Sequence, residues 1–139
     1  MAKKILKINY DDGMDFFLFG IVTGFKDYRI CYELNKALDI NLERISEHTL
    51  LVGKNNSQLK YEQFRFINEY DQSFTLIANR NEKQLLLPEL NMIDFLLIID
   101  PAEGIDTDEY LKIIKAIDLV SAAFLFDPKS LKSRQNLLN

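Results

Sequence analysis

The chain has 139 residues, of which 47% are hydrophobic and 27% charged, and its 17 basic and 21 acidic side chains give a net charge of -4. These values are typical of one soluble domain with its own core, so we expect a single domain over residues 1–139. The acidic balance argues against a nucleic-acid-binding protein, because phosphate binding usually requires excess positive charge. A single cysteine excludes an intrachain disulfide, and no apolar run approaches the ~20 residues of a membrane span, so we expect a cytoplasmic protein.

The first two apolar segments are predicted strands. Residues 3–9 (KKILKIN) alternate lysines with apolar side chains, and the turn signal DDG follows at 11–13. Residues 16–24 (FFLFGIVTG) are rich in aromatic and β-branched side chains, which favours a strand that ends at Gly24. The apolar spacing of this segment also fits a helix, so both states remain open for it.

A helix is predicted over residues 27–38 (DYRICYELNKAL), because Cys31, Leu34 and Leu38 share one stripe and Asp27 can cap its start. The segments that follow alternate in side-chain character and are predicted strands of an antiparallel meander, at 41–44, 49–52, 61–70 and 74–79.

The last third of the chain changes character. Residues 93–99 (IDFLLII) are nearly all apolar, so we expect a strand covered on both faces. A helix follows, capped by Asp106 and ended by Asp118, and residues 119–126 (LVSAAFLF) are predicted as a second buried strand. Residues 128–139 form a basic C-terminal tail.

This order of elements predicts an α+β fold. We expect a mainly antiparallel sheet with two helices on one face, in a ferredoxin-like or related split β-α-β sandwich. The last two strands can be direct neighbours or can be separated by another strand.

Glu89 and Asp94 are the most conspicuous carboxylates, because they flank the start of the most apolar strand. A catalytic pair would need two carboxyl groups that face each other across a cleft, one of them with a raised pKa. The simpler interpretation is that Pro88 fixes the approach to the strand and that both acids accept backbone N–H or Arg and Lys hydrogen bonds. A recognition surface is the second interpretation.

The other polar clusters do not predict a metal or cofactor. The acidic groups near residues 11–15 and 100–108 lack the spacing of a calcium loop, and one histidine with one cysteine makes a zinc site improbable. A dyad of Cys31 and His48 is conceivable, but a cysteine on an apolar helical stripe is usually a buried, inert thiol.

Four residues of the predicted helix at 27–38 are candidate binding residues: Asp27, Tyr28, Arg29 and Asn35. Asn35 falls on the inward stripe, where a polar side chain needs a partner, either a backbone group of the core or a ligand. The tail carries Lys, Arg and no acid, so weak contact with RNA or an acidic partner is an alternative to docking on its own domain.

Residues 87–95 (LPELNMIDF) resemble the motif that names the bacterial IPExxxVDY family. The proline, the glutamate and the aspartate match, while Leu87, Ile93 and Phe95 are conservative departures from it. Further similarity to that family covers the short segments 19–21, 27–29, 34–35 and 131–137. The resemblance implies a small soluble protein and supplies no catalytic residues. Phe95 in place of the tyrosine argues against an essential hydroxyl group there.

The residues favour a non-enzymatic domain that binds a protein partner or a second copy of itself, through a strand edge or the aromatic meander. A small-molecule-binding regulatory domain is the alternative, because split β-α-β domains often form ligand sites where they meet. Enzymatic activity through Glu89 or Asp94 has the least support.

Overall fold

The computed structural model describes residues 15–138, so the strand expected at 3–9 and the turn expected at 11–13 lie outside the described residues. In chain order, its elements are β1 (Phe17–Val22), α1 (Asp27–Leu38), β2 (Glu43–Val52), β3 (Ser57–Ile67), β4 (Ser73–Ala78), β5 (Phe95–Asp100), α2 (Thr107–Lys115), β6 (Ala122–Phe126) and the 3-10 turns η1 (Pro128–Ser130) and η2 (Arg134–Leu137). No described helix has both the length and the apolar character that crossing a membrane requires.

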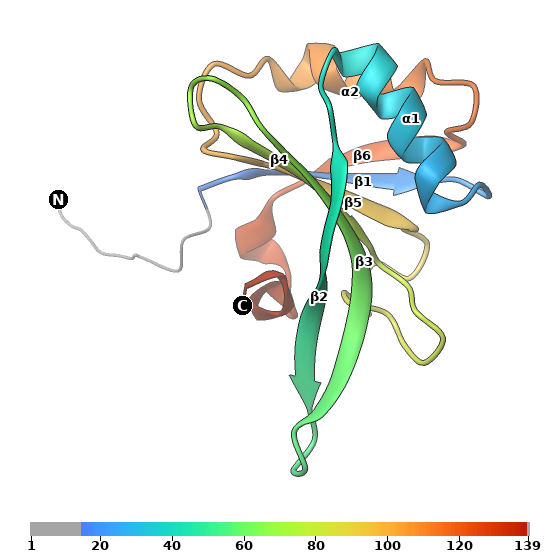
Figure 1. Ribbon diagram of the computed structural model, residues 1–139, viewed down its shortest axis with the longest axis vertical. Helices are drawn as coiled ribbons and strands as arrows, with labels where there is room; N and C mark the ends of the chain where they lie inside the picture. Colours follow the sequence, from blue (N-terminus) through green and yellow to red (C-terminus); the bar gives the residue numbers. More distant parts are fainter. Residues whose placement is uncertain (1–14, 139) are drawn as a thin grey trace, which may run out of the picture.

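The six strands form one sheet in the order β2-β3-β4-β5-β1-β6, and every neighbouring pair is antiparallel (Figure 1). Because β1 lies between β5 and β6, the unit β5-α2-β6 is split around another strand. The four strands β4-β5-β1-β6 with two helices therefore have the ferredoxin-like arrangement, and the β2-β3 hairpin extends it at one edge. The α+β prediction is confirmed.

Both helices cover one face of the sheet, as expected (Figure 1). Their buried side chains, Ile30 and Leu34 of α1 and Ile114 of α2, pack against Phe19 and Leu97 of the sheet. The apolar stripe of α1 is the one that the sequence spacing indicates, and the helix has the predicted bounds. Asp106 caps α2 by accepting a hydrogen bond from a backbone N–H three residues later.

The opposite face of the sheet is covered without an α-helix. The loop between β4 and β5 contributes Leu86, Leu87 and Ile93 to a second core, and the C-terminal tail contributes Leu131 and Leu137. Figure 1 shows the tail on the side of the sheet away from α1 and α2. The tail is thus docked on its own domain as far as residue 138, and β5 is covered on both faces as predicted.

Residues 17–22 form a strand, which decides between the two states left open for 16–24. Gly20 in this strand has a packing role that its sequence context did not indicate. A Cβ atom at Gly20 would overlap the ring of Phe126 and would lie 3.0 Å from the side chain of Ile93. The absence of a side chain lets the Phe126 ring of β6 lie across β1.

Three strand predictions need correction. The pieces expected at 41–44 and 49–52 are one strand, β2, whose register shifts between Ile45 and His48 and so breaks the side-chain alternation. The strand expected at 61–70 begins at Ser57 and ends at Ile67, because residues 68–72 form a turn. The strand expected at 119–126 is shorter and is an edge strand with exposed side chains, where a buried strand was predicted.

Candidate functional site

The loop that carries the LPELNMIDF stretch is organised by Asn79, a fully buried residue at the end of β4. Its side-chain nitrogen donates to the carbonyl oxygens of Leu90 (3.0 Å) and Ile93 (2.9 Å), and its side-chain oxygen accepts from the Leu87 N–H (2.8 Å). One amide thus satisfies three backbone groups of a loop that has no regular structure of its own. No pattern in the sequence marks Asn79 as special, because an asparagine after a strand is typical of any turn.

Asp94 lies one residue before β5 and joins three segments. One carboxylate oxygen accepts from the Thr23 N–H at 2.9 Å, and the other accepts from Nε of Arg80 at 2.8 Å. Arg80 also donates to the carbonyl oxygen of Asn91. These are the backbone N–H and arginine partners that the structural interpretation of Asp94 expects.

Glu89 binds the C-terminal tail. Its carboxylate accepts hydrogen bonds from the backbone N–H of Ser133 (2.8 Å) and from the Ser133 hydroxyl group. Partial burial acts to raise the pKa of Glu89, but the hydrogen bonds from Ser133, together with those from the backbone of Glu89 and Lys132, outweigh it and hold the pKa below its ordinary value. Glu89 is therefore charged at neutral pH and fastens the tail to the loop.

Two further contacts hold the tail in place. The side chain of Asn136 donates to the carbonyl oxygen of Leu86 at 2.8 Å, and Nε2 of buried His48 lies 2.6 Å from the Asn136 carbonyl oxygen. His48 thus binds the tail, whereas Cys31 belongs to the core on the helical face and its thiol contacts the Leu42 carbonyl oxygen. The conceivable dyad of Cys31 and His48 does not form.

Burial raises the pKa of the Cys31 thiol to about 11, and the charge of Asp27 contributes to the increase against the opposing effect of Arg44. At neutral pH this thiol is protonated, which agrees with the inert role that its helical position indicates.

The candidate residues at the start of α1 lie on the surface. The sequence predicts Asp27 as the helix cap, but Asp27 is the first residue of α1, and Lys26 occupies the capping position. The Asp27 carboxylate accepts from the Tyr28 N–H and pairs with Arg44 at 3.4 Å. Tyr28 is exposed, and the guanidinium group of Arg29 lies 5.2 Å from the Phe25 ring centre. These side chains face solvent and do not converge on a cavity.

Asn35 binds the backbone of its own domain. Its side-chain oxygen accepts from the Leu42 N–H at 2.7 Å, and its nitrogen donates to the Leu42 carbonyl oxygen at 3.3 Å. The Asn35 amide therefore satisfies both backbone groups of Leu42, as a neighbouring strand would, and holds the segment between α1 and β2 in place. Of the two interpretations of Asn35, the contacts favour the structural one.

An apolar surface lies beside the motif loop, at the β6 edge of the sheet. Met92 is 66% exposed, and Phe124 and Leu125 of β6 are 42% and 40% exposed. A groove of about 220 Å³ runs between the loop and β6 and is lined by residues 89–93, Phe124 and Phe126. We call Met92, Phe124 and this groove the β6 surface, and Leu125, the next residue of the strand, is exposed on the opposite face of the sheet. Its strand was predicted, but its exposure was not.

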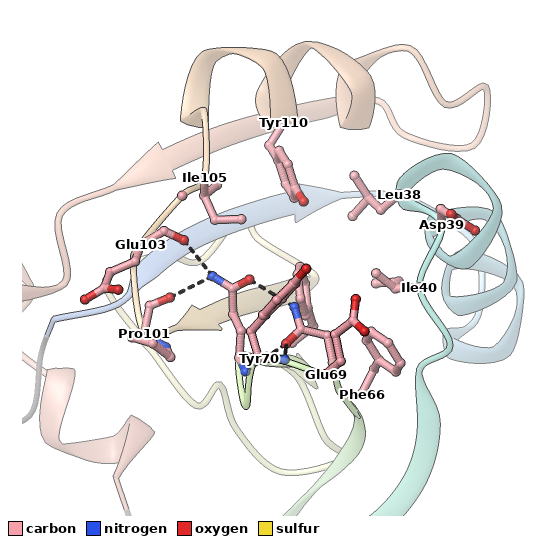
Figure 2. A pocket seen from close by; sticks show the side chains of 14 residues that line it. Leu38, Asp39, Ile40, Phe66, Glu69, Tyr70, Pro101, Glu103, Ile105 and Tyr110 are labelled. Atoms are coloured by element: carbon pink, nitrogen blue, oxygen red, sulfur yellow. Dashed lines mark hydrogen bonds between the residues drawn. The ribbon is translucent and has the colours of Figure 1, made fainter.

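A larger hollow of about 840 Å³ lies on the helical side of the sheet, between the end of α1, the β3–β4 turn, residues 101–105 and the start of α2. Apolar and aromatic side chains line it: Leu38, Ile40, Phe66, Phe74, Ile105 and Tyr110. Figure 2 shows Tyr110 directed from α2 into this space. We call it the helix-side cavity. None of the predicted site residues lines it.

Within residues 15–138, no group of three or more His, Cys, Asp or Glu side chains is placed to hold a metal ion. Comparison of the chain with protein-family models and with curated proteins finds no match. The similarity to the IPExxxVDY family therefore rests on the motif and its flanking segments alone.

Proposed function

We propose that the protein is a non-enzymatic assembly module, in which β6 of one copy pairs with β6 of a second copy. The observation that carries this proposal is an uncharged edge strand that exposes Phe124 and Leu125. An edge strand presents unpaired backbone N–H and C=O groups, and soluble proteins usually protect such edges with charges, bulges or short strands.

The opposite edge of the sheet has this protection. β2 carries Glu43, Arg44 and Glu47 and is distorted by the register shift between Ile45 and His48. Such a strand is poorly suited to pairing with another chain. β6 has the sequence AAFLF, with no charged residue and no shift in its register with β1. The β2 edge therefore has the charges and the irregular register of a protected edge, whereas the β6 edge has neither.

Antiparallel pairing of two β6 strands is compatible with a dimer that has twofold symmetry. Antiparallel pairing about an axis at Phe124, the central residue of β6, places Phe124 of each copy opposite the same residue of the other. The adjacent groove and exposed Met92 supply apolar area next to the new backbone hydrogen bonds. The contacts of Glu89 and Asp94 support a bracing role for the motif, which holds the loop that carries Met92.

Sedimentation velocity across a concentration series tests the proposal. The wild-type protein should reach twice its chain mass of 16.2 kDa, while Phe124→Lys and Leu125→Lys should remain monomeric with unchanged circular dichroism. The matched control is Leu51→Lys, because Leu51 is 56% exposed on β2 at the other edge. A wild-type monomer at all concentrations, or equal disruption by Leu51→Lys, would overturn the proposal.

We also propose a cytoplasmic location and membership of the IPExxxVDY family. The location is supported by the single cysteine, whose thiol is buried and protonated and forms no disulfide. The family assignment is supported by the matching proline, glutamate and aspartate of the motif.

A further inference from the structure

The helix-side cavity has the dimensions of a ligand site. Its volume of about 840 Å³ falls in the range of small-molecule pockets, roughly 300–1,000 Å³. Its walls come from residues 38–40, 66–74 and 101–110, which are far apart in the sequence (Figure 2). Within the described chain, none of the residues that line it belongs to the β6 surface, so a ligand here is independent of the proposed self-assembly.

The rim of the cavity is held in place by side-chain hydrogen bonds. The Gln72 side chain donates to the carbonyl oxygens of Pro101 (3.0 Å) and Glu103 (2.9 Å), which ties the β3–β4 turn to the loop before α2. The Asn68 side-chain oxygen accepts from the N–H groups of Tyr70 and Gln72 and fixes the turn itself. A preformed rim lowers the entropic cost of binding a ligand.

The ionisable carboxyl groups around the cavity give it a negative character. The described residues that line it include three acidic side chains, Asp39, Glu69 and Glu103, and no basic side chain. Figure 2 shows the Glu69 carboxylate facing the cavity, whereas the Glu103 carboxylate points outward. Burial raises the pKa of Tyr110, with a further contribution from Glu109, so its phenol is neutral and adds no charge. Acidic groups over an aromatic wall favour a cation and repel an anion.

Asp39 shows that this arrangement has a stability cost. It ends α1 in the left-handed conformation, with φ of 56°, where glycine or asparagine is favoured. Its negative charge also lies at the C-terminal end of a helix, where the helix dipole disfavours an anion. A residue that opposes both local preferences and lines a cavity fits a binding role, because function commonly retains such costs.

From this geometry we propose that the helix-side cavity binds an organic cation, an ammonium or guanidinium group on an apolar body. The apolar body lies against Phe66, Phe74 and Tyr110, and the charged group lies beside the Glu69 carboxylate, which faces the cavity in Figure 2. The cation can belong to a free small molecule or to an arginine side chain of a peptide, and the two sources share this chemistry.

Three probes of matched shape test the charge requirement by isothermal titration calorimetry and by NMR shifts of Tyr110. Benzamidinium should bind, and neutral benzamide and anionic benzoate should bind at least tenfold more weakly. A short peptide with one arginine between glycines is the second arm. Tighter binding of the peptide assigns the site to a protein partner, and tighter binding of benzamidinium assigns it to a free cation.

Glu69→Gln and Asp39→Asn should each weaken benzamidinium binding about three- to fivefold, as expected for exposed charges. The control Glu82→Gln removes an acid that lies outside this cavity and should leave affinity unchanged. Asp39→Asn should raise the melting temperature while it weakens binding, which a purely structural role would not produce. Equal binding of benzamide, no saturable binding at a few millimolar, or equal loss in Glu82→Gln would overturn the proposal.

Discussion

Replacement of Asn79 by alanine tests the bracing of the motif loop. The side chain is fully buried and makes three hydrogen bonds to backbone groups, and those to Ile93 and Leu87 are themselves buried. Loss of a buried bond that leaves its partner unsatisfied costs about 1.5 kcal/mol, and the part-buried bond to Leu90 costs about 1 kcal/mol because water can replace it. Asn79→Ala should therefore lower the free energy of unfolding by about 4 kcal/mol.

Urea denaturation followed by circular dichroism measures this loss, and a thermal scan should show a midpoint lower by about 12 °C for a chain of this size. Asn91→Ala is the matched control, because Asn91 is an exposed asparagine of the same loop whose bond to Arg80 uses only its backbone carbonyl. The control should change stability by less than about 0.5 kcal/mol. A loss in Asn79→Ala no larger than that of the control would refute the assignment of Asn79 as the organiser of the loop.

Three further changes have defined outcomes. Hydrogen bonds from Ser133 lower the pKa of Glu89, so the contribution of Glu89 to stability is complete above its ordinary pKa of 4.5 and is lost as the pH falls through the lowered pKa. Glu89→Gln should therefore lower the free energy of unfolding at pH 7 and reduce the dependence of that free energy on pH in the acid range. An unchanged dependence on pH would contradict this. Gly20→Ala should cost about 1–3 kcal/mol in chemical denaturation because the Phe126 ring must move, and a neutral effect would refute the packing role of Gly20. Cys31, with a pKa of about 11, should react with Ellman's reagent at pH 8 only after denaturant is added, whereas rapid reaction of the native protein would show an accessible thiol.

The sequence predicts regular elements well where one periodicity continues without interruption. The helix at 27–38 has the predicted bounds because its stripe of Cys31, Leu34 and Leu38 continues to its end. β2 was divided in two because the register shift near residues 45–48 reverses the alternation of its side chains. The burial of β6 was overestimated because an apolar run looks the same in a central strand and in an exposed edge strand.

The site residues show a different limit. Glu89, Asp94 and Asn35 are polar residues in apolar stretches of the sequence, and in the structure each makes hydrogen bonds to backbone groups of its own chain. The binding role proposed for them from the sequence stays a prediction. The sequence does not predict the helix-side cavity, because Asp39, Glu69 and Tyr110 lie far apart in the chain and come to line one cavity only through the tertiary packing of both helices and the β3–β4 turn.

Hydrogen exchange of the β6 amide groups tests the central proposal, that β6 pairs with β6 of a second copy, most directly. Samples are compared by mass spectrometry or NMR well above and well below the concentration at which sedimentation shows half dimer. The proposal predicts slower exchange for amides of residues 122–126 at high concentration, with no change at the β2 edge over residues 43–48. Exchange at β6 that does not depend on concentration in a dimeric sample, or new protection at β2, would contradict it.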